Sequence, residues 1–171
     1  VVVSAAVNPL NRKALAAYAA NLELEAVEVP HRDGRHDMEA LAAATDEKTC
    51  SVVVSQPGYF GYLSDFGKLA EAVHGKGALL IASVYPAALG VVRPPGAMGA
   101  DIVAGEGQPF GMRLSWGGPY LGFLSARGEY VRRMPGRIVG ATKDTHGRRG
   151  FVLTLQTREQ HIRREKAMSN I

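Results

Sequence analysis

A glycine-rich stretch, GEGQPFGMRLSWGGPYLGFLSA at residues 105–126, has the clearest potential for ligand chemistry in the sequence. Glycine loses more conformational freedom on folding than any other residue, so six of them here indicate unusual backbone angles or a close approach. Gly117-Gly118 precedes a predicted strand and could present backbone N–H groups to a phosphate. A tight loop packed against a neighbouring chain explains the glycines equally well.

Two other polar or aromatic stretches are predicted to be structural. The string HRDGRHD at residues 31–37 has metal-type side chains, but its two arginines would repel a cation, which favours a solvated connecting loop. The string QPGYFG at residues 56–61 follows a predicted strand, where ligand loops sit. The simpler interpretation, which we prefer, is a turn with Tyr59 and Phe60 folded onto the core.

No nucleophile motif is present. The sequence lacks G-x-S-x-G, a P-loop, and a G-x-G-x-x-G after a strand. Cys50 and His161 are far apart in the chain, and nothing orients them as a catalytic pair. Cys50, within the apolar run TCSVVVS, is predicted to be a small buried residue, and His161, next to Arg163 and Arg164, a surface or interface residue.

Alternating strands and helices must position any site in the first half. Asn8 and Asp37 are predicted helix caps, and Ser64 is a third. The predicted strands are Val1–Ala5, Ala26–Val29, Thr49–Ser55 and Ala78–Ala82, and the predicted helices are 9–18, 38–44 and 65–75. This order predicts an α/β fold with a mostly parallel sheet and helices on both faces. Ligands would then lie at the loops after Val54, Ala82 and Ala104.

The second half is less regular. We predict a helical turn, three strands and two short helices, the last opened by the capping box Thr157-Arg-Glu-Gln160. The turn is 87–92, the strands are 101–104, 120–125 and 151–155, and the helices are 127–134 and 161–167.

Composition favours a single globular domain over residues 1–171, with 46% hydrophobic and 21% charged residues. No apolar run approaches the roughly 18 residues of a membrane span, and we expect no membrane partner. One cysteine fits a reducing compartment: the cytoplasm of a bacterium, or the mitochondrion of a eukaryote. The chain opens inside a predicted strand without an initiator Met, so we expect it to be a piece of a longer polypeptide.

Charge is unevenly distributed. Residues 1–126 have 9 Lys and Arg against 12 Asp and Glu, whereas residues 127–171 have 11 against 4. A basic tail suits nucleic acid, an acidic partner, a phosphate-bearing ligand or solvated helix faces. No aromatic residues are interleaved among the arginines as a single-strand binder requires, so nucleic acid is not expected.

Two stretches closely resemble one enzyme family. They are ADIVAGEGQPFGMRLSWGGPYLGFLSARGEYVRRMPGR at residues 100–137 and GRRGFVLTLQTREQHIRREKAMSNI at residues 147–171. Both are similar to glycine dehydrogenase (decarboxylating), the P-protein of the glycine cleavage system. The resemblance covers nearly the whole chain, and it is greatest to the α subunit (subunit 1) or the N-terminal half of the single-chain form.

The resemblance implies part of the large domain of a fold type I enzyme dependent on pyridoxal phosphate (PLP). This family decarboxylates glycine and passes the aminomethyl group to the lipoyl arm of the H-protein, with PLP as the electron sink. The cofactor lysine belongs to the β-type subunit or half, in an His-Lys pair after a strand. Gln108 and Pro109 stand at those positions here. Ser83 stands near the position of the aspartate that pairs with the pyridine nitrogen, and no carboxylate occurs from Ala82 to Gly90.

These departures favour a subunit that does not hold PLP covalently and supports a partner that does. Fold type I sites lie at subunit interfaces, so Ser115, Trp116, Gly117 and Gly118 are candidates to contact the partner's PLP site. The basic residues Arg137, Arg148 and Arg149 could meet a phosphate, the carboxylate of glycine, or acidic patches on the H-protein; ion pairs at a subunit interface are the alternative. No catalytic residue and no metal site is assigned to this chain.

Two further hypotheses remain at this point. One is a different fold type I PLP enzyme, such as a desulfurase-like protein, which the lack of any lysine between Ser83 and Gly140 disfavours. The other is a catalytically silent scaffold or anion-binding module on the same fold.

Overall fold

The computed structural model describes residues 1–155 and 160–167. The chain divides into two compact units, Val1–Ser125 and Ala126–Ile171, and each is described by itself. The single domain expected over residues 1–171 stays a prediction.

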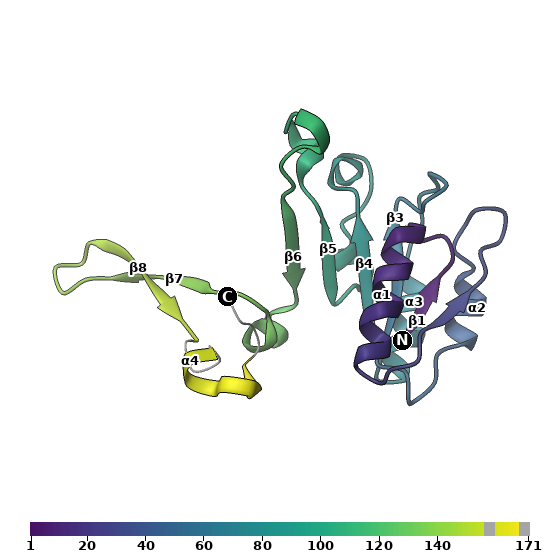
Figure 1. Ribbon diagram of the computed structural model, residues 1–171, viewed down its shortest axis with the longest axis horizontal. Helices are drawn as coiled ribbons and strands as arrows, with labels where there is room; N and C mark the ends of the chain where they lie inside the picture. Colours follow the sequence, from purple (N-terminus) through teal and green to yellow (C-terminus); the bar gives the residue numbers. More distant parts are fainter. Residues whose placement is uncertain (156–159, 168–171) are drawn as a thin grey trace. The chain divides into compact units, whose positions relative to one another are not determined.

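Unit 1 alternates strands and helices, and short 3-10 turns become frequent after β4 (Figure 1). Its elements are β1 Val2–Ser4, α1 Pro9–Asn21, β2 Val27–Val29, α2 Met38–Ala43, β3 Ser51–Gln56, α3 Gly67–Gly75, β4 Leu79–Val84, η1 Pro86–Gly90, η2 Pro95–Met98, β5 Ile102–Glu106, η3 Gln108–Phe110, η4 Ser115–Gly117 and β6 Gly122–Ala126, whose last residue belongs to unit 2.

The strands of unit 1 form one sheet in the order β2-β1-β3-β4-β5-β6. The pairs β1–β2, β1–β3, β3–β4 and β4–β5 are parallel, with Val54 opposite Ala82 and Ser83 opposite Ala104. The predicted α/β fold with a mostly parallel sheet is confirmed. Every residue of β3 is buried, as expected for a strand covered on both faces.

Helices cover both faces of this sheet. The larger core cluster joins strand residues such as Val52 and Leu80 to Leu41 of α2 and to Leu69 and Val73 of α3. A smaller cluster, Val3, Val7 and Val53, lies on the opposite face with Leu15 of α1 packed against it. Successive side chains of a strand point to opposite faces, so adjacent valines of one strand join different clusters.

Two of the three predicted helix caps are confirmed. The Oδ1 atom of Asn8 accepts from the N–H of Leu10, and Oδ1 of Asp37 accepts from the N–H of Ala40, both near 3 Å. The prediction for Ser64 is wrong. α3 begins two residues later than that cap requires, because the backbone of Ser64 is bonded to a side chain of β3 instead.

Cys50 is exposed, so its predicted burial is wrong. β3 begins at Ser51, and Cys50 therefore belongs to the turn before the strand rather than to its buried core. None of the described helices is long and apolar enough to span a membrane.

Unit 2 contains an antiparallel hairpin that the sequence predicted only in part. β7 pairs with β8 along its whole length, from Ile138 opposite Thr154 to Lys143 opposite Arg149, and only the second strand was expected. The capping residue predicted at Thr157 lies outside the described residues. The unit's elements are η5 Gly128–Arg133, β7 Ile138–Lys143, β8 Arg149–Thr154, α4 Gln160–Arg163 and η7 Arg164–Lys166.

Candidate functional site

A cleft of about 660 Å³ opens at the carboxyl ends of the parallel strands of unit 1. These are the loops at which the sequence places a ligand, after β3, β4 and β5. Its lining is mostly polar and aromatic. The lining residues are Asn8, Asn11, Ser55, Pro57, Tyr59, Ser83, Val84, Tyr85, Ala104, Gly105, Glu106 and Tyr120.

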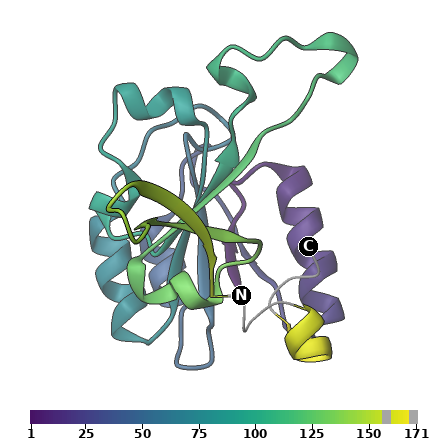
Figure 2. The same cartoon turned by 90° about the vertical axis from the view of Figure 1, so that its left-hand side faces the viewer.

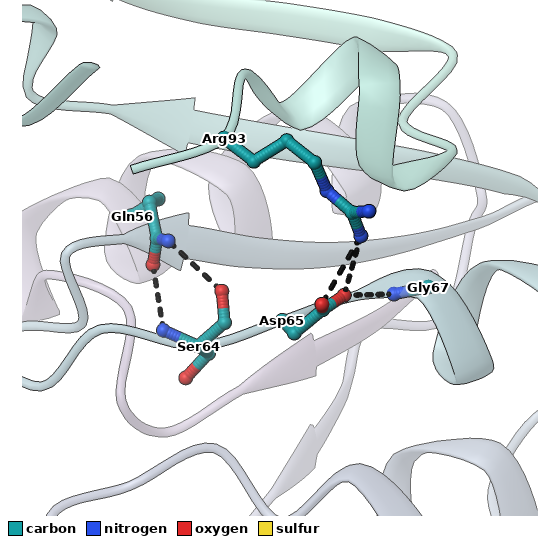
Figure 3. A network of polar contacts seen from close by, with 5 residues as sticks. All are labelled: Gln56, Ser64, Asp65, Gly67 and Arg93. Carbon is teal, nitrogen blue, oxygen red and sulfur yellow. Dashed lines mark hydrogen bonds and ion pairs between the residues drawn. The ribbon is translucent and has the colours of Figure 1, made fainter. Parts of the chain in front are cut away.

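Gln56, the last residue of β3, holds the loop that forms one wall of this cleft. Its buried side chain donates from Nε2 to the carbonyl of Ser64 (2.9 Å), and its Oε1 accepts from the N–H of the same residue (3.1 Å). Figure 3 shows this two-way bond beside a second clamp, in which Asp65 accepts from the N–H of Gly67 and from Arg93. The two clamps hold residues 64 and 65, through which the loop leads into α3.

The aromatic residues of this loop are not folded onto the core as predicted. Tyr59 and Phe60 are 55% and 50% exposed, and Tyr59 lines the cleft. The N–H of Tyr59 donates to the carbonyl of Ala6 at 2.7 Å, which ties the loop to the segment after β1.

The 31–37 loop is only partly the solvated connection that was predicted. His36 is 6% exposed, with Nδ1 at 2.7 Å from Oγ of Ser4 and Nε2 at 2.9 Å from the carbonyl oxygen of Ser55. Burial lowers the pKa of His36, although the bond to Ser55 opposes this shift. Among the described residues, no group of His, Cys, Asp and Glu is placed to hold a metal ion.

The glycine-rich loop, residues 107–121, connects the end of β5 to the start of β6 (Figures 1 and 2), and four of the predicted site residues form one turn in it. Ser115, Trp116 and Gly117 form η4, and Gly118 follows with φ +72° and ψ 167°. All four have positive φ, which is rare for serine and tryptophan. The side chain of Trp116 is fully exposed.

The three predicted arginines belong to unit 2, so the structure does not relate them to this loop. Arg137 is exposed just before β7. Arg148 forms an ion pair with Asp144 in the turn of the hairpin (Nε–Oδ2 2.9 Å), and the guanidinium of Arg149 lies over the ring of Phe151. The backbone N–H of Arg148 also bonds to Asp144 and lowers the pKa of that carboxyl.

The cleft does not suit a covalently held, phosphate-bearing cofactor. Glu106 is the one residue of a charged type among its described lining residues, and it is acidic. Ser83, whose hydroxyl cannot act as the charge partner of a pyridinium, lines the cleft at the end of β4. Pro109 occupies the turn directly after β5, and its ring cannot form an imine.

Sequence reasoning missed several of the cleft residues. Asn11, Tyr85, Glu106 and Tyr120 each lie just after a helix start or next to a strand end. For Asn11 and Tyr85 that position was the only available signal, whereas Glu106 and Tyr120 lie within the glycine-rich stretch 105–126 and were not singled out in it.

All 171 residues match the family described as "Glycine cleavage system P-protein". The chain belongs to this family. A P-protein solved in an inhibitor-bound form superposes on it with a TM-score of 0.92 and 46% identity, over 99% of this chain and 38% of that one. The cleft and the glycine-rich loop therefore belong to a P-protein fold.

Curated relatives of this chain are named as subunits of glycine dehydrogenase (decarboxylating). A probable glycine dehydrogenase (decarboxylating) subunit 1 of Geotalea uraniireducens is 54% identical over 170 residues, and one of Brevibacillus brevis is 54% identical over 172. The chain spans 38% of the length of each. An O-acetylhomoserine sulfhydrylase of Wolinella succinogenes, at 19% identity and a TM-score of 0.54 over 72% of this chain and 33% of that one, shares the fold alone.

Proposed function

We propose that this chain is part of the α-type subunit, or half, of a glycine dehydrogenase (decarboxylating). In the complete enzyme, glycine is decarboxylated and its aminomethyl group passes to the lipoyl arm of the H-protein. Family membership over all 171 residues supports this assignment and sets the desulfurase-like alternative aside. PLP, held by a lysine of the β-type partner, supplies the electron sink there.

The observation that most supports a non-covalent role is the chemistry at the end of β5. Pro109 stands in the turn where the family pattern places the lysine, and Ser83 stands near the place of the aspartate; the described lining residues of the cleft include no lysine or arginine. We infer that this subunit shapes the partner's site instead of holding the cofactor itself.

The glycine-rich loop is the part of this chain that we assign to the partner's PLP site. Ser115–Gly118 form a preformed turn, and Trp116 is a large exposed aromatic residue of the kind that anchors protein interfaces. Closing the partner's site with such a turn would exclude water and help orient glycine. Arg137, Arg148 and Arg149 are proposed to meet glycine, a phosphate or acidic groups of the H-protein.

Glycine–bicarbonate exchange tests this proposal with the full-length subunit and its lysine-bearing partner. We expect exchange from the mixture and none from either subunit alone. Trp116→Ala should reduce exchange at limiting partner concentration, whereas Tyr18→Ala, an exposed aromatic change on α1, should not. Imine absorbance when PLP is added to this subunit alone, trapped by borohydride reduction, would contradict the assignment.

The same proposal places the protein in the cytoplasm of a bacterium or the mitochondrion of a eukaryote, where the H-protein would be its partner. Fractionation followed by detection of the subunit and the H-protein in one compartment would test this.

A further inference from the structure

One carboxylate closes the base of the glycine-rich loop. The Oε1 atom of Glu106 accepts from the N–H of Gln108 at 3.0 Å and from the N–H of Leu121 at 2.5 Å. Beside it, the N–H of Gly107 donates to the carbonyl of Leu121 at 2.7 Å. The first and last residues of the loop are thus joined around a single side chain at the end of β5.

Apart from this carboxylate, short-range backbone bonds hold the loop: the N–H groups of Phe110 and Met112 donate to the carbonyls of Gly107 and Gln108, both at 3.0 Å. Its large apolar side chains lie outside the core: Phe110, Leu114, Trp116 and Tyr120 are all more than 70% exposed. Inside the loop, the side chain of Gln108 contacts the carbonyl of Gly117 at a long 3.5 Å. A loop without packed side chains keeps one conformation only if its ends and turns are fixed by hydrogen bonds, because each ordered residue loses backbone entropy.

We propose that Glu106 is a positioning residue, which sets the loop in its docking shape before the partner subunit binds. This rests on the proposed function of the loop as the element that reaches the partner's site. A loop that is ordered in the free subunit loses less conformational entropy on association, and the affinity rises accordingly. Glu106 itself touches no reacting atom in this role.

The two hydrogen bonds require an acceptor oxygen at the right distance from the backbone of residue 106, and they do not require its negative charge. Glu106→Gln keeps a carbonyl oxygen at the same distance from the backbone, and one oxygen can accept both bonds. Glu106→Asp keeps the charge but is one methylene shorter, so it cannot reach both N–H groups. Glu106→Ala removes the acceptor altogether, and Glu71→Ala, an exposed change on α3, is the matched control.

Fluorine NMR of the full-length subunit labelled with 5-fluorotryptophan tests the proposal without any need for activity. The Trp116 resonance is assigned by its loss in Trp116→Phe. We expect an unchanged resonance in Glu106→Gln and Glu71→Ala, and a sharper line in Glu106→Asp and Glu106→Ala, because the exposed ring of Trp116 then moves with a looser backbone. If Glu106→Ala fails to fold, Glu106→Asp gives the same comparison. An unchanged resonance in Glu106→Asp, or a sharper one in Glu106→Gln, overturns the proposal.

Titration with the lysine-bearing partner then separates this proposal from the function on which it rests. We expect Glu106→Ala and Glu106→Asp to weaken association roughly tenfold, and the affinity of Glu106→Gln to stay close to that of the parent. If Trp116→Ala associates normally, the docking function fails even though the fluorine result stands. If Trp116→Ala weakens association but the Glu106 variants do not, Glu106 is not the positioning residue.

Discussion

The Nδ1 atom of His36 lies 2.7 Å from the hydroxyl oxygen of Ser4, and its Nε2 lies 2.9 Å from the carbonyl oxygen of Ser55. A carbonyl can only accept, so Nε2 bears the proton and Nδ1 accepts from Ser4. The neutral ring therefore joins the end of β1 to the end of β3, directly beneath the cleft wall. Its edge also faces the ring of Phe66 in the core.

This arrangement predicts that acid destabilises the protein through His36. Burial lowers the pKa of His36 in the folded state below its ordinary value of 6.5, so the unfolded chain binds more protons. The free energy of unfolding should be highest above about pH 6.5 and fall as the pH drops from there toward the folded-state pKa. Urea unfolding of the full-length subunit at several pH values measures this slope.

Two substitutions make this first prediction specific. His36→Gln should flatten the slope and lower stability at neutral pH by about 1–3 kcal/mol, because buried partners of the ring are left unsatisfied. His146→Gln, in the exposed turn between β7 and β8, should keep the slope of the parent. A parental slope in His36→Gln would mean that another group governs the acid response.

The parallel sheet was predictable because its sequence signals agree with one another. The β-branched run of β3 and the caps at Asn8 and Asp37 each point to the same βαβ order. The cap predicted at Ser64 was wrong because the rule considers only neighbouring residues. The side chain of Gln56, eight residues earlier in β3, forms hydrogen bonds with the backbone of Ser64 instead. Such long-range competition is invisible to a reading of neighbouring residues.

A second prediction compares the two clamps of the 57–63 loop. Gln56→Ala should lower the free energy of unfolding by about 1–3 kcal/mol, because the half-buried backbone groups of Ser64 lose their partner. Arg93→Ala removes an ion pair with Asp65 whose side chains are 54% and 70% exposed, and should change stability by about 1 kcal/mol or less. Chemical denaturation of both variants measures which one loses more stability. Equal losses in the free energy of unfolding would contradict the prediction.

A third prediction concerns Cys50. Because it is exposed in the turn before β3, it should react with a thiol reagent in the native state. Mass mapping of native protein after brief labelling should find the Cys50 peptide modified, and Cys50→Ser should lose that modification. Labelling that appears only in denaturant would show that Cys50 is covered in the intact protein.

The site was less predictable than the sheet, for a physical reason. The cleft arises where three strand ends meet, so its wall residues, such as Tyr85 and Glu106, are distant in sequence and have no shared motif. The glycine-rich stretch 105–126 was found because glycine is informative by itself: at Gly105 in β5, for example, a Cβ would lie 2.5 Å from the carbonyl oxygen of Val84. Periodicity also missed β7, since its residues alternate weakly and its pairing partner follows a turn.

The last prediction tests the shape of the glycine-rich loop at Gly118. Its backbone angles, φ +72° and ψ 167°, are accessible almost only to glycine, and a Cβ there would lie 2.8 Å from the carbonyl oxygens of Arg113 and Leu114. Gly118→Ala should therefore distort the turn at a cost of about 1–3 kcal/mol and weaken association with the partner subunit. Gly122→Ala is the matched control, because a Cβ there meets no atom within 4 Å. Association measured by titration calorimetry should fall for Gly118→Ala alone; parental affinity in this variant would show that the turn does not contact the partner.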